Sequence, residues 1–340
     1  MLLCFSADWH VSNFGADRRG PVSDRGAACL RVVERLYDIQ GVDRHVGLGD
    51  IFDTDKPTPG LVASLMDRIT APTMLLVGNH DQTSAEDKHN ALAPLSSVAS
   101  VVESMQVFSL GSTDLALLGF RYRDSIVDTL RSVEWSADSK FRVVCLHMGI
   151  SDNRTPLHLR KSAGSIGARN LAELCQEIGA AHVFSGDWHN PEDWEISGVR
   201  ICQVGGLIPQ RYGDPHEVHG RVALFDTETA ELSFKTLNGP RFVTVDGDPP
   251  WDVPTVPDAD PLHVRYLTDR KNWDRALEEA EALGVQCKVA TPKTVQEQTT
   301  QVDLDVEVPP PDEVALKAAF EKGGQPLADL MSRVLSEVTR

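Results

Sequence analysis

The segment HVGLGDIFD, residues 45–53, carries the pattern that decides the fold of this chain. Residues 45–48 form a short apolar run that is typical of a β-strand, and the polar motif Gly49-Asp50-x-x-Asp53 follows at once. In open α/β sheets, ligands bind beyond the carboxyl ends of the strands. The segment therefore predicts a strand of an α/β fold with a polar site at its carboxyl end.

Four further polar motifs stand at or just past the end of an apolar run: Asp8-Trp9-His10, Gly78-Asn79-His80-Asp81, His147 after VVCL, and Gly186-Asp187-Trp188-His189-Asn190. Such motifs can converge at one crevice although they lie far apart in the sequence. Their carboxylates, imidazoles and side-chain amide, without a thiolate, favour manganese, iron, zinc or magnesium over copper or an iron–sulfur cluster. Each motif alone occurs in many unrelated chains, so the predicted metal site depends on all five together.

Glycines precede the acidic or amide residue in three of these motifs, at Gly49, Gly78 and Gly186. Glycine adopts backbone conformations that other residues avoid. We therefore expect these positions to form tight turns that direct the polar side chains toward a common point.

Short β-type runs alternate with helical patterns along most of the chain, which predicts an α/β layered fold. The expected strands cover residues 2–6, 45–48, 73–77, 107–109, 115–120, 142–146, 182–184, 200–204, 221–226 and 231–236, and the expected helices cover 27–40 and 60–69. The later strands are joined by turns rather than helices, which predicts a second sheet that is partly antiparallel.

A change of composition divides the chain after residue 245. We expect a catalytic domain over 1–245, a Pro-rich linker over 246–261 and a small capping or partner-docking domain over 262–340. Strands at 263–267 and 285–289 around a helix at 273–283 predict a small β-α-β cap. A terminal helix over 327–340 has an apolar stripe that either folds back on this cap or docks on a partner.

Composition limits the classes of protein to which the chain can belong. Its 340 residues are 41% apolar, enough for a sizeable core, and its formal charge of -17 repels nucleic acid and anionic membranes except through local contacts. No apolar run approaches the roughly 18 residues that span a bilayer. Polar residues stand where a signal peptide has its apolar stretch, and the six cysteines are scattered singly, so we expect a cytoplasmic protein with reduced thiols.

Together, the five motifs make residues 1–237 resemble the calcineurin-like metallophosphoesterases. The resemblance implies a sandwich of two mixed sheets flanked by helices, and two divalent metal ions that hold a hydroxide for in-line attack on a phosphate. It assigns Asp8, His10 and His189 to the first metal, Asn79 and His147 to the second, and Asp50 to both. It also implies that His80 is the catalytic histidine, that Asp81 orients it, and that Asp53 supports the metal ligands.

One position departs from the pattern of that superfamily. Its last motif is usually Gly-His-x-His, and here Asp187 replaces the first histidine, which binds the second metal. A carboxylate is a harder donor than imidazole, so ligation by Asp187 favours Mn²⁺ as the native metal, with Mg²⁺, Fe and Zn²⁺ as alternatives. The other interpretation is that Asp187 only supports the ligands and leaves the second site weak.

The flanking sequence is similar to one branch of the superfamily, the SbcD-type DNA repair exonucleases. The run GLGDIFDTDKPTP, the Gly-Asn-His-Asp motif and the segment LALLGFRYRD carry this similarity, and GDWHN with ICQVGGLIPQRYGDP resembles phage-encoded relatives. A DNA exo- or endonuclease is therefore the leading hypothesis. A phosphodiesterase or phosphatase on nucleotides or other small phosphate esters is the alternative. A non-catalytic binding module is a third, against which the intact metal motifs weigh.

The similarity also suggests partners. The chain has no Gly-x-x-x-x-Gly-Lys-Ser/Thr phosphate loop, so an SbcC-type ATPase would be a separate chain, and a homodimer is a further expected assembly. Arg18, Arg19 and Arg154 lie just after metal motifs and are candidates for binding DNA phosphates, with an ordinary solvated loop face as the alternative. We expect no membrane partner, and a phage-encoded protein would act in the host cytoplasm.

Overall fold

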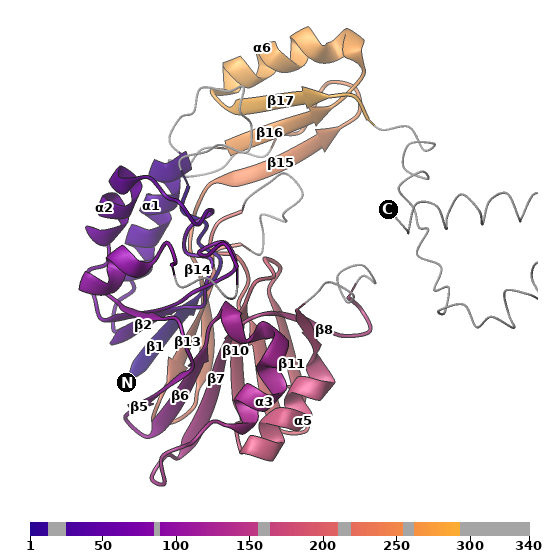
Figure 1. Cartoon of the computed structure of the whole chain (residues 1–340). Coiled ribbons are helices and arrows are strands. Elements are labelled where there is room, and N and C mark those ends of the chain that lie inside the picture. The colour runs from indigo at the N-terminus through magenta and orange to yellow at the C-terminus, as the bar shows by residue number, and fades with distance from the viewer. Residues whose placement is uncertain (13–24, 85–88, 156–163, 210–218, 254–261, 293–340) are drawn as a thin grey trace, which may run out of the picture. The chain divides into compact units, whose positions relative to one another are not determined.

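The computed structural model describes residues 1–12, 25–84, 89–155, 164–209, 219–253 and 262–292. These residues form two six-stranded mixed sheets, a three-stranded sheet and a two-stranded ribbon. Helices cover the outer faces of the two large sheets (Figure 1). The predicted fold class, two mixed sheets flanked by helices, is confirmed.

The first sheet has the order β14-β13-β1-β2-β3-β4. Its strands are β1 (Leu2–Ser6), β2 (Arg44–Gly47), β3 (Thr73–Leu76), β4 (Ser100–Val102), β13 (Arg221–Asp226) and β14 (Leu232–Thr236). Strands β1 to β4 are parallel, and β13 and β14 add an antiparallel hairpin beside β1. The expectation that the later strands belong to the second sheet is therefore wrong for β13 and β14. These two strands cover the edge of β1, and Ala223 and Phe225 join its core residues Leu3 and Phe5.

The second sheet has the order β11-β12-β10-β7-β6-β5. Its strands are β5 (Gln106–Leu110), β6 (Thr113–Leu118), β7 (Phe141–His147), β10 (His182–Gly186), β11 (Glu192–Ile196) and β12 (Val199–Gln203). The four central strands are parallel, and the edge strands β5 and β11 are antiparallel. Just beyond β7, the short strands β8 (Gly149–Ser151) and β9 (Ser165–Gly167) pair in parallel.

Alternation of side chains along the strands builds the layers. In β1, Leu3 and Phe5 face the other sheet, and Cys4 faces the helices. The rings of Phe5 and Phe184 stack between the sheets with centroids 4.0 Å apart. Helices α1 (Arg25–Tyr37) and α2 (Pro59–Met66), with the 3-10 turn η1 (Ala93–Ser97), cover the first sheet, and α3 (Ile126–Arg131) and α5 (Ala168–Ile178), preceded by η2 (Phe120–Ser125), cover the second (Figure 1).

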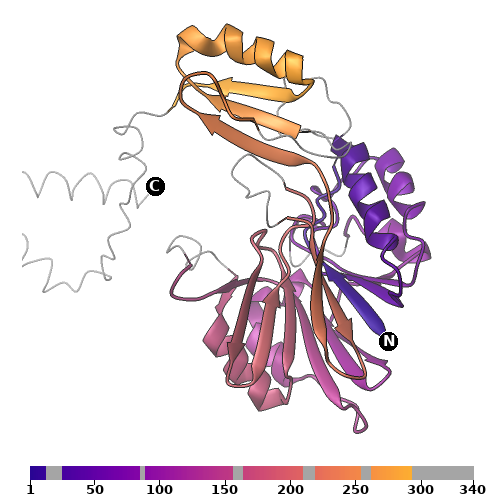
Figure 2. The ribbon, with the colours of Figure 1, turned by 180° about the vertical axis from the view of Figure 1, so that it is seen from behind.

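A three-stranded parallel sheet follows the sandwich in sequence. It consists of β15 (Arg241–Asp246), β16 (Leu262–Leu267) and β17 (Gln286–Ala290), with η3 (Arg270–Asn272) and α6 (Trp273–Leu283) between β16 and β17. Helix α6 lies across one face of this sheet, where Ala276 and Ala280 pack among its buried residues (Figure 2). The expected β-α-β pattern is therefore present, and β15, which precedes the Pro-rich stretch, adds a third strand to it.

Residues 1–291 form one compact unit. The predicted terminal helix over 327–340 lies outside the described residues. The domain boundaries at 245 and 261 remain a prediction. No helix among the described residues has the length and apolar character that crossing a membrane requires.

Candidate metal centre

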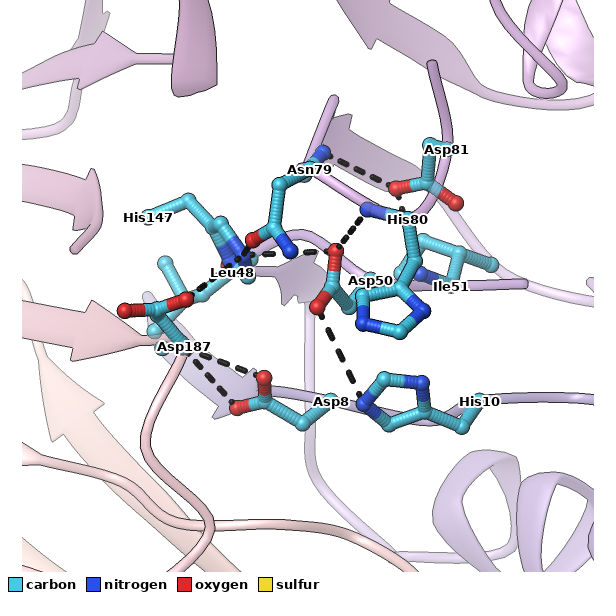
Figure 3. A network of polar contacts seen from close by, with 12 residues as sticks. Asp8, His10, Leu48, Asp50, Ile51, Asn79, His80, Asp81, His147 and Asp187 are labelled. Atoms are coloured by element: carbon cyan, nitrogen blue, oxygen red, sulfur yellow. Dashed lines mark hydrogen bonds and ion pairs between the residues drawn. The ribbon is translucent and has the colours of Figure 1, made fainter. Parts of the chain in front are cut away.

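The five motifs meet at the carboxyl ends of five parallel strands (Figure 3). Asp8 and His10 follow β1, Asp50 follows β2, and Asn79 follows β3. In the second sheet, His147 is the last residue of β7, and Asp187 and His189 follow β10. The structure thus brings together every predicted metal ligand, from positions as far apart as residues 8 and 189.

One group of ligand atoms comes from Asp8, His10 and His189, whose donor atoms lie within 4.8 Å of one another. The Nε2 atoms of His10 and His189 are 3.1 Å apart. Two imidazole nitrogens that face each other at this distance, beside a carboxylate, suit a cation between them. This group corresponds to the first predicted metal site.

A second group surrounds His147. Its Nε2 lies 2.9 Å from Oδ1 of Asn79 and 3.9 Å from Oδ1 of Asp187. Asp187 therefore directs its carboxylate toward the same imidazole nitrogen as the predicted ligand Asn79. This position is that of a side chain able to bind the second metal.

Asp50 lies between the two groups. Its Oδ1 is 3.3 Å from Nε2 of His147, and its Oδ2 is 3.8 Å from Nε2 of His10. The two oxygens of one carboxylate thus face one group each. A carboxylate that binds two cations at once needs this arrangement.

The centre concentrates charge in a buried place. Burial raises the pKa of Asp8, and the same burial opposes ionisation of Asp50, but the neighbouring imidazoles of His147 and His10 hold the pKa of Asp50 well below its usual range. Burial alone would lower the pKa of His147, yet the carboxylates of Asp50, Asp187 and Asp8 raise it to about 10. Buried carboxylates and imidazoles this close together offer the oxygen and nitrogen donors that suit divalent cations.

Backbone strain is concentrated in the same residues. Among the described residues, six other than glycine have a positive φ, and four of them are Asp8 (50°), His10 (43°), Asp50 (51°) and Asp187 (88°). Left-handed conformations are unfavourable for residues with a side chain and persist where the surrounding structure fixes them, often at functional sites. The strain therefore supports a functional role for these four residues, including Asp187.

The three glycines of the motifs serve two different purposes. Gly49 has a φ of 93°, which fits the expected tight turn. Gly78 and Gly186 do not have a positive φ, so neither position uses the left-handed conformation that glycine permits. Both instead lie too close to neighbouring backbone for a side chain, because a Cβ on Gly78 would lie 2.2 Å from the Asp50 nitrogen and one on Gly186 would lie 2.6 Å from the Leu48 oxygen.

A main-chain carbonyl orients His147. Its Nδ1–H donates to the carbonyl oxygen of Leu48 over 2.7 Å, which leaves Nε2 directed at Asn79 and Asp50. The sequence reasoning missed this contact. No side chain identifies such a carbonyl, although Leu48 stands directly before the Gly-Asp motif.

Asp81 has a different role from the expected one. Its carboxylate accepts hydrogen bonds from the backbone N–H groups of Ile51, Phe52 and Gly78, so it holds two loops together and does not orient the His80 ring. Burial and the nearby Asp50 raise the pKa of Asp81 to about 6.

Asp53 is the carboxylate that lies beside His80. The Nδ1 atom of His80 is 3.3 Å from the Asp53 carbonyl oxygen and 3.8 Å from its Oδ1, and the same Oδ1 is 3.3 Å from Nδ1 of His10. The backbone N–H of His80 donates to Oδ1 of Asp50 over 2.8 Å. These contacts place His80 at the centre. Its side chain is 44% exposed, so the imidazole also faces solvent.

The predicted phosphate contacts are only partly described. Arg18 and Arg19 lie outside the described residues. Arg154 has a 63% exposed side chain, and its guanidinium forms ion pairs with Asp152, over 2.7 Å, and with Glu192. These two carboxylates offset its charge, and its contact with a substrate remains a prediction.

The chain is similar to a known protein family and to several solved structures. The model of the family described as calcineurin-like phosphoesterase matches residues 1–191. A search of curated proteins finds no match. Among solved structures, the chain is similar to a purple acid phosphatase from yellow lupin seeds, with 15% identity, a TM-score of 0.39, and coverage of 56% of this chain and 38% of that one.

Two further solved structures cover more of the chain. One is described as a novel archaeal phosphodiesterase, with 12% identity, a TM-score of 0.40, and coverage of 70% of this chain and 100% of that one. The other is a predicted phosphoesterase from Streptococcus pneumoniae, with 15% identity, a TM-score of 0.34, and coverage of 69% and 88%.

Proposed function

The chain belongs to the calcineurin-like phosphoesterase family, and on this premise we propose that it is a metal-dependent DNA exo- or endonuclease of the SbcD type. The position of Asp50 carries the catalytic part of the proposal, because its two oxygens face two separate groups of ligand atoms. A site with that arrangement suits hydrolysis of a phosphate ester with two metal ions.

The two metal sites follow from the two groups of donors. The first would use Asp8, His10 and His189, the second Asn79, His147 and Asp187, and Asp50 would belong to both. The carboxylate of Asp187 favours Mn²⁺ over Zn²⁺ at the second site. When bound, divalent cations polarise the oxygens of a phosphate and lower the pKa of a bound water.

His80 is the residue of the chain that would move a proton. Its ring is partly exposed at the centre. Two contacts position it: the ring Nδ1 lies beside the carbonyl oxygen of Asp53, and the backbone N–H of His80 donates to the Asp50 carboxylate. An imidazole in this place can donate a proton to the leaving oxygen of a phosphodiester. Asp81 would act indirectly, because its three hydrogen bonds to backbone N–H groups hold together the loops that carry Asp50 and His80.

Sequence and domain layout support DNA as the substrate. The run GLGDIFDTDKPTP is similar to the corresponding segment of SbcD-type nucleases, and the sheet β15-β16-β17 with α6 follows the sandwich where that family carries a capping domain. The net charge of -17 disfavours DNA binding by the chain alone. We therefore also propose an SbcC-type ATPase as partner, with residues 262–340 as the docking domain and a homodimer as the alternative assembly.

The same net charge favours one other candidate function. A phosphodiesterase or phosphatase that acts on nucleotides or other small phosphate esters needs no extended basic surface, because its substrate carries few phosphates. The two candidates differ in the size of the substrate and share the same metal centre.

An assay with four substrates tests the proposal. Purified full-length protein with Mn²⁺ would be incubated with single-stranded DNA, double-stranded DNA, bis-p-nitrophenyl phosphate and a nucleoside monophosphate, and Asp50→Asn would serve as the inactive control. We expect cleavage of DNA that disappears with EDTA and in Asp50→Asn. Hydrolysis of the small esters with intact DNA would contradict the nuclease and support the alternative.

A further inference from the structure

We propose that Trp188 is a stacking platform for a DNA base that flanks the phosphate bound at the metal centre. Trp188 stands between Asp187 and His189, which belong to the two different groups of ligand atoms. Trp188 is therefore the direct sequence neighbour of one residue from each group. The inference rests on the proposed action on DNA and names a residue that would select the substrate.

The indole ring packs directly on the backbone of Gly149. A Cβ on Gly149 would lie 2.2 Å from Cε2 and 2.2 Å from Nε1 of Trp188, which is too close for any side chain. Gly149 begins β8, two residues after the ligand His147. The ring is therefore supported from one side by the strand that extends from the metal centre.

Buried polar side chains hold both partners of this contact. Gln203 is 1% exposed, and its Oε1 accepts a hydrogen bond from Ile150 N–H over 3.1 Å. Its Nε2 donates to the carbonyl oxygen of Asn190 over 2.8 Å, and Ser185 Oγ donates to the Met148 carbonyl over 2.6 Å. Gln203 thus ties β8 to the loop that carries Trp188, which holds the backbone of Gly149 and that of the tryptophan loop together.

A second tryptophan in an equivalent position shows what a packing residue looks like. Trp9 stands between the ligands Asp8 and His10, is 0% exposed, and donates from Nε1 to Ser6 Oγ over 2.9 Å. Trp188, by contrast, is only partly buried. Part of the Trp188 ring is therefore open to a ligand, which the ring of Trp9 is not.

Stacking on a fixed aromatic ring is a general way to bind single-stranded nucleic acid. Every base has an aromatic face, so the contact gives affinity without requiring one sequence, and it carries no charge. Such a contact suits a chain with a net charge of -17, because it does not depend on neutralising phosphates with basic side chains. The substrate class that fits is a DNA strand whose base beside the scissile phosphate is unstacked.

A comparison of two oligonucleotides tests the stacking. Wild type, Trp188→Ala and Trp188→Phe would cleave a single-stranded oligonucleotide and a second one whose residues flanking the cleavage site lack bases. On the normal strand, we expect Trp188→Ala to lower kcat/KM by about 5- to 150-fold and Trp188→Phe to lower it much less. On the abasic strand, all three proteins should have the same kcat/KM, and metal content should be unchanged.

Control measurements separate this inference from the proposed function. Trp135 is half-buried, precedes β7 at its amino end and donates to the Ile178 carbonyl, so Trp135→Phe should behave as wild type. Binding of a single strand in EDTA should quench tryptophan fluorescence in wild type and Trp135→Phe but much less in Trp188→Phe. Equal loss of kcat/KM on both strands in Trp188→Ala, or equal quenching in all proteins, would overturn the stacking role. Failure of the wild type to cleave any DNA would instead contradict the nuclease.

Discussion

Acid should destabilise this protein through His45, a histidine in β2 that is remote from the metal centre. Its side chain is 1% exposed, its ring lies against that of Tyr37 with centroids 4.4 Å apart, and its Nδ1 has no hydrogen-bond partner among the described residues. Burial lowers the pKa of His45 from 6.5 to about 4. The folded protein therefore keeps this imidazole neutral where the unfolded chain binds a proton.

The size of the effect follows from the two pKa values. Between pH 6.5 and pH 4, the unfolded state binds more protons at this position, so the free energy of unfolding rises with pH. The stability is complete above about pH 6.5 and is lost as the pH falls toward 4. From pH 7.5 to pH 4.5, the contribution of His45 amounts to a loss of about 2.5 kcal/mol.

Urea unfolding in EDTA at pH 7.5 and pH 4.5 measures this contribution. His45→Phe keeps a ring beside Tyr37 and removes the titration, so it should lose about 2.5 kcal/mol less than wild type between the two pH values. The exposed His89 provides the matched control, because His89→Gln should follow the wild type. An identical loss in wild type and His45→Phe would refute the conclusion that burial keeps His45 neutral.

Three further predictions concern the metal centre. His80→Ala should keep the metal content of the wild type and lower turnover by about 10² to 10⁴, as expected for loss of a proton donor, and an equal loss of metal and turnover would contradict that role. Asp50→Asn should lose both metals in elemental analysis, because its two oxygens face both groups of ligand atoms, and near-complete occupancy would refute a bridging position. Asp187→His should retain two metals and move activation from Mn²⁺ toward Zn²⁺, since imidazole is a softer donor than carboxylate. Identical metal content and identical activation by each metal in wild type and Asp187→His would show that Asp187 does not bind metal.

The sequence alone predicted the strands at whose ends the candidate site lies and the side chains that are its candidate donors. The strands at residues 2–6, 221–226 and the helix at 273–283 coincide with β1, β13 and α6, because apolar runs and helical spacing are local properties that a linear pattern records. Each polar motif follows such a run directly, which is why Asp8, Asp50 and His147 could be placed at strand ends before their positions in space were known.

Some elements escaped the prediction for different reasons. Strand β4 has three residues, which is too few to show the alternation of apolar and polar side chains that indicates a strand. Strand β15 stands next to the Pro-rich stretch that we interpreted as a linker. Helix α5 does carry a local signal, since its buried residues Leu171, Leu174 and Cys175 are spaced for one face and Gly179 ends it in the left-handed conformation.

Only the tertiary structure decided which groups meet. The placement of β13 and β14 beside β1, the hydrogen bond from His147 to the Leu48 carbonyl, and the hydrogen bonds from the Ile51 and Phe52 N–H groups to Asp81 all join segments that are distant in sequence. Main-chain N–H and carbonyl groups are the same at every residue, so the sequence cannot show which of them a side chain will contact. The position of Asp50 between His10 and His147 likewise exists only once two sheets have packed with their carboxyl edges together.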